Sequence, residues 1–123
     1  MNRELQRIRN NNVRKYIDIM DGTYRNHIRF NSHNSLEHEL VKAEICYALL
    51  KANKEFLTEC KLKGLRNVSD VFVTDSAHVI EILHTETDKK FEEKLSKYPD
   101  GLKVIKVFTK NYNIKDISEV FYT

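Results

Sequence analysis

Three short strand-like segments follow one another in the middle of the chain, and this run most constrains the fold. Residues 55–62, 68–74 and 79–83 are rich in β-branched and aromatic side chains, and the links between them are short enough for hairpins. Residues 88–98 then return to helical spacing, and residues 102–108 form a fourth strand-like segment. A helix between the third and fourth strands implies that these two strands pair in parallel. The sequence therefore predicts an α/β protein with a mixed central sheet of about four strands flanked by helices.

Two helices are predicted before the first strand. Residues 3–20 carry an apolar residue at roughly every third or fourth position, and Asp21-Gly22 follows as a stop. Residues 35–53 are apolar around most of the helix circumference, with Ser35 as the N-cap, so we expect this helix to be largely buried. Its clearest apolar stripe consists of Leu36, Leu40, Ala43, Tyr47 and Leu50. The tail, residues 114–121, fits either a short helix or an edge strand.

Length and composition favour one compact domain. The chain has 123 residues, of which 41% are hydrophobic and 32% charged, and a chain of this size supports one core. It contains no apolar stretch of the roughly 18 residues that a membrane span needs, and its polar N-terminus lacks the apolar centre of a signal peptide. We therefore expect a cytoplasmic protein without membrane contact. Its reduced Cys46 and Cys60 are expected to be small core residues.

Positive charge is concentrated at the front of the chain. Residues 1–31 carry seven basic and three acidic side chains, whereas the other 92 residues carry 14 basic and 15 acidic ones. We interpret residues 1–31 as a basic N-terminal helix or arm and residues 32–123 as a single core domain. Such a segment is typical of contact with a phosphate backbone, although a solvated helix face has the same composition. The predicted nucleic-acid contacts are Arg3, Arg7, Arg9, Arg14, Lys15 and Arg66.

Two acidic residues stand within otherwise apolar strand segments. Asp70 precedes Val71-Phe72-Val73, and Glu81 lies in the middle of residues 79–83. A carboxylate in such a position costs free energy unless a cation or hydrogen-bond donors compensate it. On paired strands the two carboxylates can converge on one divalent ion, and oxygen ligands suit Mg²⁺ or Mn²⁺. The alternative is that Glu81 lies on a solvated face of the sheet.

The second helix adds further acids. Glu37, Glu44 and Lys51 project at nearly the same angle from residues 35–53. This charged stripe either reaches over the sheet toward the strand acids or pairs internally with Lys51. The sequence does not decide which of Glu37, Glu44 and Glu59 completes an acidic cluster, because that depends on how the helix is rotated against the sheet.

Three segments in this order resemble a known superfamily. They are Ser35-Leu36-Glu37-His38-Glu39-Leu40-Val41, then Arg66-Asn67-Val68-Ser69-Asp70-Val71-Phe72-Val73, and Val79-Ile80-Glu81-Ile82-Leu83. Over about residues 35–108 the chain resembles the PD-(D/E)xK nucleases, which have the restriction-endonuclease-like fold. The first segment is similar to the start of the core helix in archaeal Holliday-junction resolvases. In addition, His38, Lys42 and Glu59 match the helix His, helix Lys and strand Glu of competence-type nucleases.

The resemblance implies a restriction-endonuclease-like core with an added N-terminal helix. It also implies a Mg²⁺- or Mn²⁺-dependent DNA endonuclease acting on branched or recombination intermediates, with Glu37, Asp70 and Glu81 as catalytic metal ligands. A two-fold homodimer would then place two sites on two strands.

One position departs from the superfamily pattern. Leu83 stands where these nucleases usually carry the Lys that orients the attacking water. The candidates to replace it are Lys42, Lys51, Lys61 and Lys63, among which the sequence does not choose; Lys61 is the one included in the predicted catalytic set. Two alternatives stay open. One is a nuclease-fold protein that has lost cutting and binds nucleic acid or a protein partner, and the other is an unrelated α/β interaction module whose acids lie on the surface.

Overall fold

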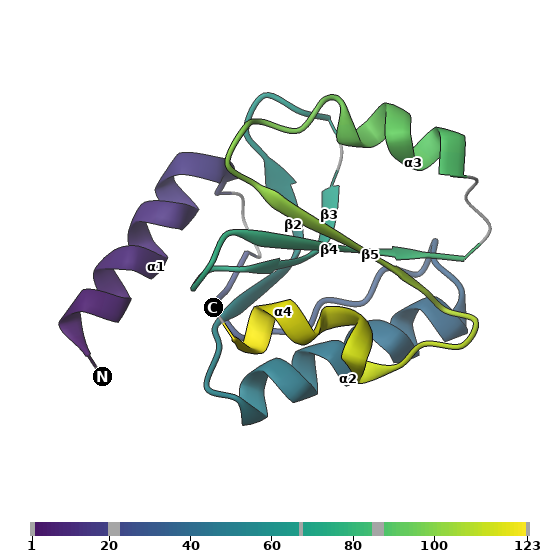
Figure 1. The fold of residues 1–123 in the computed structure, drawn as a ribbon, viewed down its shortest axis with the longest axis horizontal. Helices are drawn as coiled ribbons and strands as arrows, with labels where there is room; N and C mark the ends of the chain where they lie inside the picture. Colours follow the sequence, from purple (N-terminus) through teal and green to yellow (C-terminus); the bar gives the residue numbers. More distant parts are fainter. Residues whose placement is uncertain (1, 20–22, 67, 85–87, 123) are drawn as a thin grey trace.

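The protein folds around one five-stranded mixed sheet with the strand order β1-β2-β3-β4-β5 (Figure 1). The computed structural model describes residues 2–19, 23–66, 68–84 and 88–122. The strands are β1 Ile17–Asp18, β2 Phe56–Leu62, β3 Val68–Val73, β4 His78–Leu83 and β5 Lys103–Phe108. β1 to β4 pair antiparallel with their neighbours, whereas β4 and β5 pair in parallel. The predicted α/β class, the mixed sheet and the parallel pairing are thus confirmed, while the restriction-endonuclease-like fold remains a prediction.

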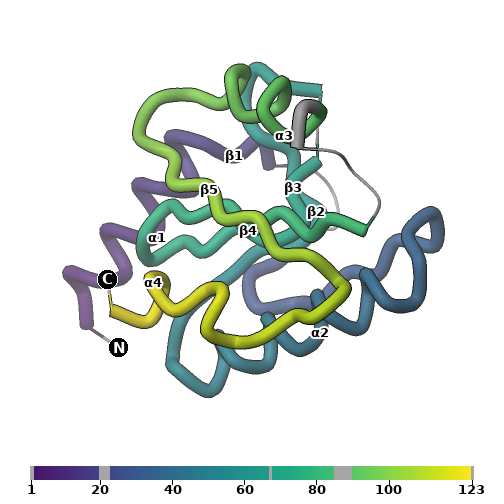
Figure 2. Tube along the Cα trace, turned by 45° about the vertical axis from the view of Figure 1, so that its right-hand side comes forward, coloured from purple at the N-terminus to yellow at the C-terminus, as the bar shows by residue number. Residues whose placement is uncertain are grey.

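Helices cover both faces of this sheet. They are α1 Arg3–Tyr16, α2 Leu36–Lys51, α3 Asp88–Leu95 and α4 Ser118–Phe121, the last preceded by the 3-10 helix η1 Ile114–Ile117. Figures 1 and 2 show α2 and α4 together on one side of the sheet and α3 on the other. The tail, residues 114–121, for which the sequence allows a short helix or an edge strand, is therefore helical. No helix in the described part of the chain is long and apolar enough to cross a membrane.

The first helix ends earlier than the sequence predicts. Ile17 leaves the helix with an extended backbone and pairs with Leu62, which creates the short edge strand β1. Its apolar side chain is fully buried, so tertiary packing overrides the continued helical spacing. Asp21 and Gly22, the predicted stop, lie outside the described residues.

Two apolar cores lie between the sheet and the helices on its two faces. The first lies between α2, the C-terminal helices and the sheet, and it is centred on Ile45, Leu49 and Ile80. The second joins α1 to the opposite face through Val13 and Tyr16. Cys46 and Cys60 are unpaired and fully buried in these cores, and burial raises the pKa of both thiols to about 12, as expected for inert core residues.

The rotation of α2 differs from the expectation. The face that packs on the sheet contains His38, Val41, Lys42, Ile45 and Leu49. The stripe from Leu36 to Leu50, part of a helix expected to be largely buried, faces outward. Because this helix is apolar around most of its circumference, it has two faces that could be buried, and only packing against the sheet decides between them.

The N-terminal segment packs on the core rather than extending from it. Arg9 of α1 is buried, and its guanidinium makes two 3.0 Å contacts with the Asp75 carboxylate and a 2.8 Å hydrogen bond to the Asn53 carbonyl. Asn12 also donates to the Thr74 carbonyl at 2.8 Å. One face of α1 therefore anchors the helix to the β3–β4 turn.

Candidate functional site

The two central strands separate where their acidic residues stand. The pairing of β3 with β4 runs from Val73↔His78 to Val71↔Ile80 and goes no further, so Asp70 and Glu81 lie just past its end. The Ile82 N–H donates instead to Asp70 Oδ2 at 2.7 Å. The Asp70 side chain thus replaces the missing backbone acceptor, which keeps this buried donor satisfied while the strands open.

A break in β2 turns a third acid toward the same place. Glu59 has φ +50, a left-handed conformation that is uncommon for a non-glycine residue. Leu57 and Cys60 pack in the same core, although strict alternation would put them on opposite faces of the sheet. The pairing with β3 keeps one register on both sides of Glu59, so this residue changes the face on which the following side chains lie without adding a residue. Its own carboxylate contacts Lys42 of α2.

α2 supplies a cation and a histidine to these acids. Lys42 is completely buried, and its Nζ lies 2.8 Å from Glu39 Oε2 and 3.5 Å from Glu59 Oε1. His38 Nε2 lies 3.3 Å from Asp70 Oδ1, and its Nδ1 lies 3.0 Å from Glu39 Oε1. The spacing of four residues puts His38 and Lys42 on one face of the helix, one turn apart.

Charge compensation shifts two pKa values in this cluster. Burial acts to lower the pKa of His38, but the hydrogen bonds and charges of Asp70 and Glu39 outweigh it, so this pKa is raised. Because both ring nitrogens face carboxylates, the doubly protonated imidazolium fits the contacts better than either neutral tautomer. Burial likewise acts to raise the pKa of Glu39, and the hydrogen bonds from Lys42 and Asn34 reverse the direction and lower it.

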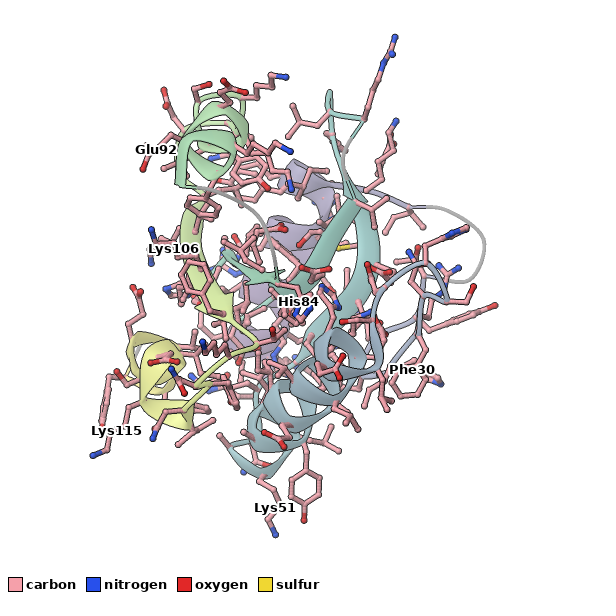
Figure 3. The ribbon with its side chains drawn as sticks, turned by 90° about the vertical axis from the view of Figure 1, so that its right-hand side faces the viewer. Phe30, Lys51, His84, Glu92, Lys106 and Lys115 are labelled. Carbon is pink, nitrogen blue, oxygen red and sulfur yellow. The ribbon has the colours of Figure 1, made fainter. Side chains whose placement is uncertain are left out.

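The cluster opens into a polar pocket of about 320 Å³. Glu81 lines it with only 5% of its surface exposed, and the Tyr98 hydroxyl donates to Glu81 Oε1 at 3.2 Å. The residues around the pocket are Asn31, Asn34, His38, Glu59, Val68, Asp70, Glu81, Ile82, Leu83, His84 and Lys94. His84 marks this end of β4 at the centre of Figure 3. Because Asp70 and Glu81 are buried, they are not on a solvated sheet face.

The structure brings together two of the three predicted metal ligands. Asp70 and Glu81 line one pocket, whereas Glu37 is exposed on α2 and does not line it. The reason is rotational, since neighbouring helix residues point about 100° apart and His38 occupies the inward position. Glu44 is also exposed, so among the acids left open by the sequence, Glu59 is the one that joins the cluster.

The four candidate lysines lie in different environments. Lys61, on β2 opposite the edge strand β1, pairs with Asp18 at 3.2 Å and is partly exposed. Lys63 donates to the Arg14 carbonyl, and Lys51 is exposed at the far end of α2. Only Lys42 among the four contacts the buried acids.

The predicted nucleic-acid contacts do not form one surface. Arg3, Arg7, Arg14 and Lys15 are exposed on α1, which lies at the edge of the molecule opposite the side shown in Figure 3. Arg9 is buried in its ion pair with Asp75. Arg66 is exposed beside β3, two residues from the pocket-lining Val68. These cations were grouped because most of them are close in sequence, but the fold places them on different parts of the molecule.

Sequence reasoning left Glu39 out of the site. It is buried, accepts hydrogen bonds from Asn34 and the Asn31 N–H at 2.9 and 3.2 Å, and pairs with both His38 and Lys42. The spacing of Glu39 and Lys42 on a helix was the available signal, because such a pair on an inward face is compensated even when buried.

The arrangement has an excess of negative charge. Four carboxylates, of Glu39, Glu59, Asp70 and Glu81, accompany three cations, Lys42, protonated His38 and the pocket-lining Lys94. Glu59 Oε1 is buried with no hydrogen-bond partner among the described residues. Within the same residues, no three or more His, Cys, Asp or Glu side chains are already grouped as a metal site.

No family model, no curated protein and no solved structure matches this chain.

Proposed function

We propose that the chain is a metal-dependent DNA endonuclease of the PD-(D/E)xK type, acting on branched or recombination intermediates. The observation that carries the proposal is the opening of β3 and β4 at Asp70 and Glu81, which directs two carboxylates into a polar pocket. A buried lysine and histidine lie against the same acids. Nucleases of this kind need a carboxylate pair beside a cation at an accessible end of the sheet.

The residues present fit Mg²⁺ or Mn²⁺. Both ions prefer oxygen ligands, and Mg²⁺ is commonly bound through one or two carboxylates together with water and substrate phosphates. Asp70 and Glu81 supply that pair, and Glu59, whose Oε1 has the Lys42 ion pair but no hydrogen bond, adds to the local negative potential. A bound Mg²⁺ would polarise the scissile phosphate and lower the pKa of a bound water.

Lys42 is the candidate lysine that lies against the acid cluster, where Leu83 stands in place of the usual lysine. Leu83 is buried and apolar, so it cannot hold or orient a water molecule. Lys42 reaches the acid cluster from the helix instead and is held there by Glu39, Glu59 and the Arg29 carbonyl, the last at 3.1 Å. We infer that it holds the Glu39 and Glu59 carboxylates in place behind the pocket, while His38 fixes the position of the Asp70 carboxylate.

DNA is the partner that the charges near the pocket favour. Lys94 lines the pocket, Arg66 is exposed beside it, and Arg29 lines the adjoining depression that shares Glu59 and Val68 with it. These side chains can contact phosphates on either side of the acidic centre. The α1 cations would meet DNA only if the duplex bends around the molecule or a second protomer presents them.

The test is cleavage of labelled linear duplex, single-stranded and four-way-junction DNA with Mg²⁺ or Mn²⁺. Asp70→Asn, Glu81→Gln and Lys42→Met are compared with Glu92→Gln, a conservative change at an exposed position of α3. We expect cutting to fall by about 100-fold or more in the first three variants, the loss typical of removing one electrostatic group from an active site. Glu92→Gln should cut like the unaltered protein.

Binding measured in the same samples separates the alternatives. Cutting lost with binding retained in Asp70→Asn and Glu81→Gln supports the nuclease. Binding without cutting in the unaltered protein, unchanged in both variants, would show a nuclease-like fold that only binds nucleic acid. Neither binding nor cutting by the unaltered protein, with native circular dichroism, would refute both functions.

A further inference from the structure

An apolar seam runs along the outward face of α2. It consists of Leu36, Leu40, Ala43, Tyr47 and Leu50. Leu36 and Tyr47 are 70% and 64% exposed, and the other two large side chains of the seam are about half exposed. The alternating spacings of four and three residues are those of a helix that packs lengthwise against another helix. Within the described residues, no other element covers this face.

A shallow depression lies beside the seam. It has a volume of about 520 Å³ and is lined by Ile28, Leu40, Ala43, Glu44 and Tyr47, with almost entirely apolar walls. Ile28 comes from the segment before α2, so the seam is widened on one side by a second stretch of chain. Contiguous apolar surfaces of this kind on a folded protein commonly mark an interface.

We propose that this seam is the interface of a homodimer, in which α2 packs antiparallel against α2 of a second copy across a two-fold axis. Ala43 lies at the midpoint of the seam, where a small side chain lets the two helices approach most closely. The axis places Leu36 of each copy against Leu50 of the other and Leu40 against Tyr47. The dimer would form whether or not the pocket cleaves DNA.

Charge favours the antiparallel orientation. Glu37, Glu44 and Lys51 flank the seam on one side at spacings of seven residues, and all three are exposed. In an antiparallel pair this flank meets the same flank of the other copy, so Glu37 faces Lys51 at both ends. In a parallel pair it would meet the opposite flank, which here holds Glu39 and Cys46, both buried against the sheet. Figure 3 shows Lys51 projecting freely from the end of the helix.

The same geometry sets a limit on the affinity. Glu44 lies close to the axis and meets Glu44 of the partner subunit, which is unfavourable. The seam follows a helix of 16 residues, roughly 24 Å long, so the interface is at the small end for specific pairs. We therefore expect a dimer with a dissociation constant in the micromolar range, about 1–100 μM.

Sedimentation equilibrium between about 1 and 300 μM protein tests the proposal. We expect the mass to rise from 14.6 kDa toward twice that value across this range. Leu40→Glu should raise the dissociation constant by about 10-fold or more, because it places a charge in the apolar seam. Leu95→Glu, the same change at a partly exposed leucine of α3, should leave it unchanged. A protein that stays monomeric throughout, or that dimerises equally well with Leu40→Glu, would overturn the proposal.

A charge-reversal cycle tests the orientation. Glu37→Lys and Lys51→Glu should each weaken the dimer by roughly 5-fold, since each creates two like-charge contacts of a few tenths of a kcal/mol. The double variant should restore the original affinity, and Glu44→Gln should strengthen it. If the double variant is as weak as the two single changes predict together, the antiparallel pairing is wrong.

Discussion

The buried ion pair between Arg9 and Asp75 gives the sharpest test of how α1 is held. The Arg9 side chain is 5% exposed and the Asp75 side chain 6%, and two 3.0 Å contacts join them. Arg9→Met keeps most of the aliphatic stem but leaves the Asp75 carboxylate buried with only the 2.8 Å hydrogen bond from the Glu55 N–H. Removing one partner of such a pair typically costs about 3–5 kcal/mol. For a domain of this size the melting temperature should fall by about 10–20 °C.

The assay is urea unfolding followed by circular dichroism, with Arg7→Met as the control. Arg7 lies two residues earlier on the same helix and pairs with Glu4 at 2.6 Å, but both side chains are more than 60% exposed. We expect Arg7→Met to cost about 0.5 kcal/mol or less. Arg9→Met combined with Asp75→Asn should be more stable than Arg9→Met alone, because no buried charge is left unpaired. Equal costs for Arg9→Met and Arg7→Met would refute the packing of α1 described above.

Two further predictions concern titration and backbone conformation. The pKa of His38, measured by NMR, should exceed 6.5, and its contribution to stability, complete below pH 6.5, should be lost as the pH rises through the folded-state pKa. His38→Gln should remove this part of the pH dependence of stability. An identical pH profile for the variant and the unaltered protein would contradict the prediction. Gly101 has φ +95, and an added Cβ would collide with the Tyr16 hydroxyl, so Gly101→Ala should cost about 2–3 kcal/mol in thermal unfolding. Gly64→Ala, at φ +77 with open space around it, should cost about 1 kcal/mol, and equal costs would show that the collision is relieved.

The strands and their pairing were predictable because each carries its own local signal. β-branched runs with short links fix the antiparallel hairpins, and the intervening α3 requires the parallel pairing of β5. β1 was missed because its two residues continue the helical spacing of α1, and only the contact of Ile17 with Leu62 makes it a strand. Local patterns do not report such long-range pairing.

The strand acids of the site were predictable, and the second resemblance also named His38, Lys42 and Glu59, which the structure brings into the cluster. Asp70 and Glu81 were recognisable because a carboxylate within an apolar strand costs free energy unless a cation or hydrogen-bond donors compensate it. Glu37 was assigned through the resemblance to the resolvases, and Glu39 was not a candidate. Helix rotation depends on packing, and α2 has two apolar faces that sequence alone ranks equally. The turn of Glu59 toward α2 depends on one left-handed residue, for which glutamate gives no signal.

Several features that cost free energy meet at the pocket. The left-handed Glu59, the ends of β3 and β4 that do not pair with each other and the fully buried Lys42 adjoin one another. Burial of charge is not by itself the distinguishing feature, because the Arg9–Asp75 pair is equally buried. That pair meets its hydrogen-bonding needs within the protein, whereas in the cluster Glu59 Oε1 has the Lys42 ion pair at 3.5 Å but no hydrogen bond, and the carboxylates outnumber the cations. Incompletely compensated acids beside an open polar pocket are typical of a ligand-binding site.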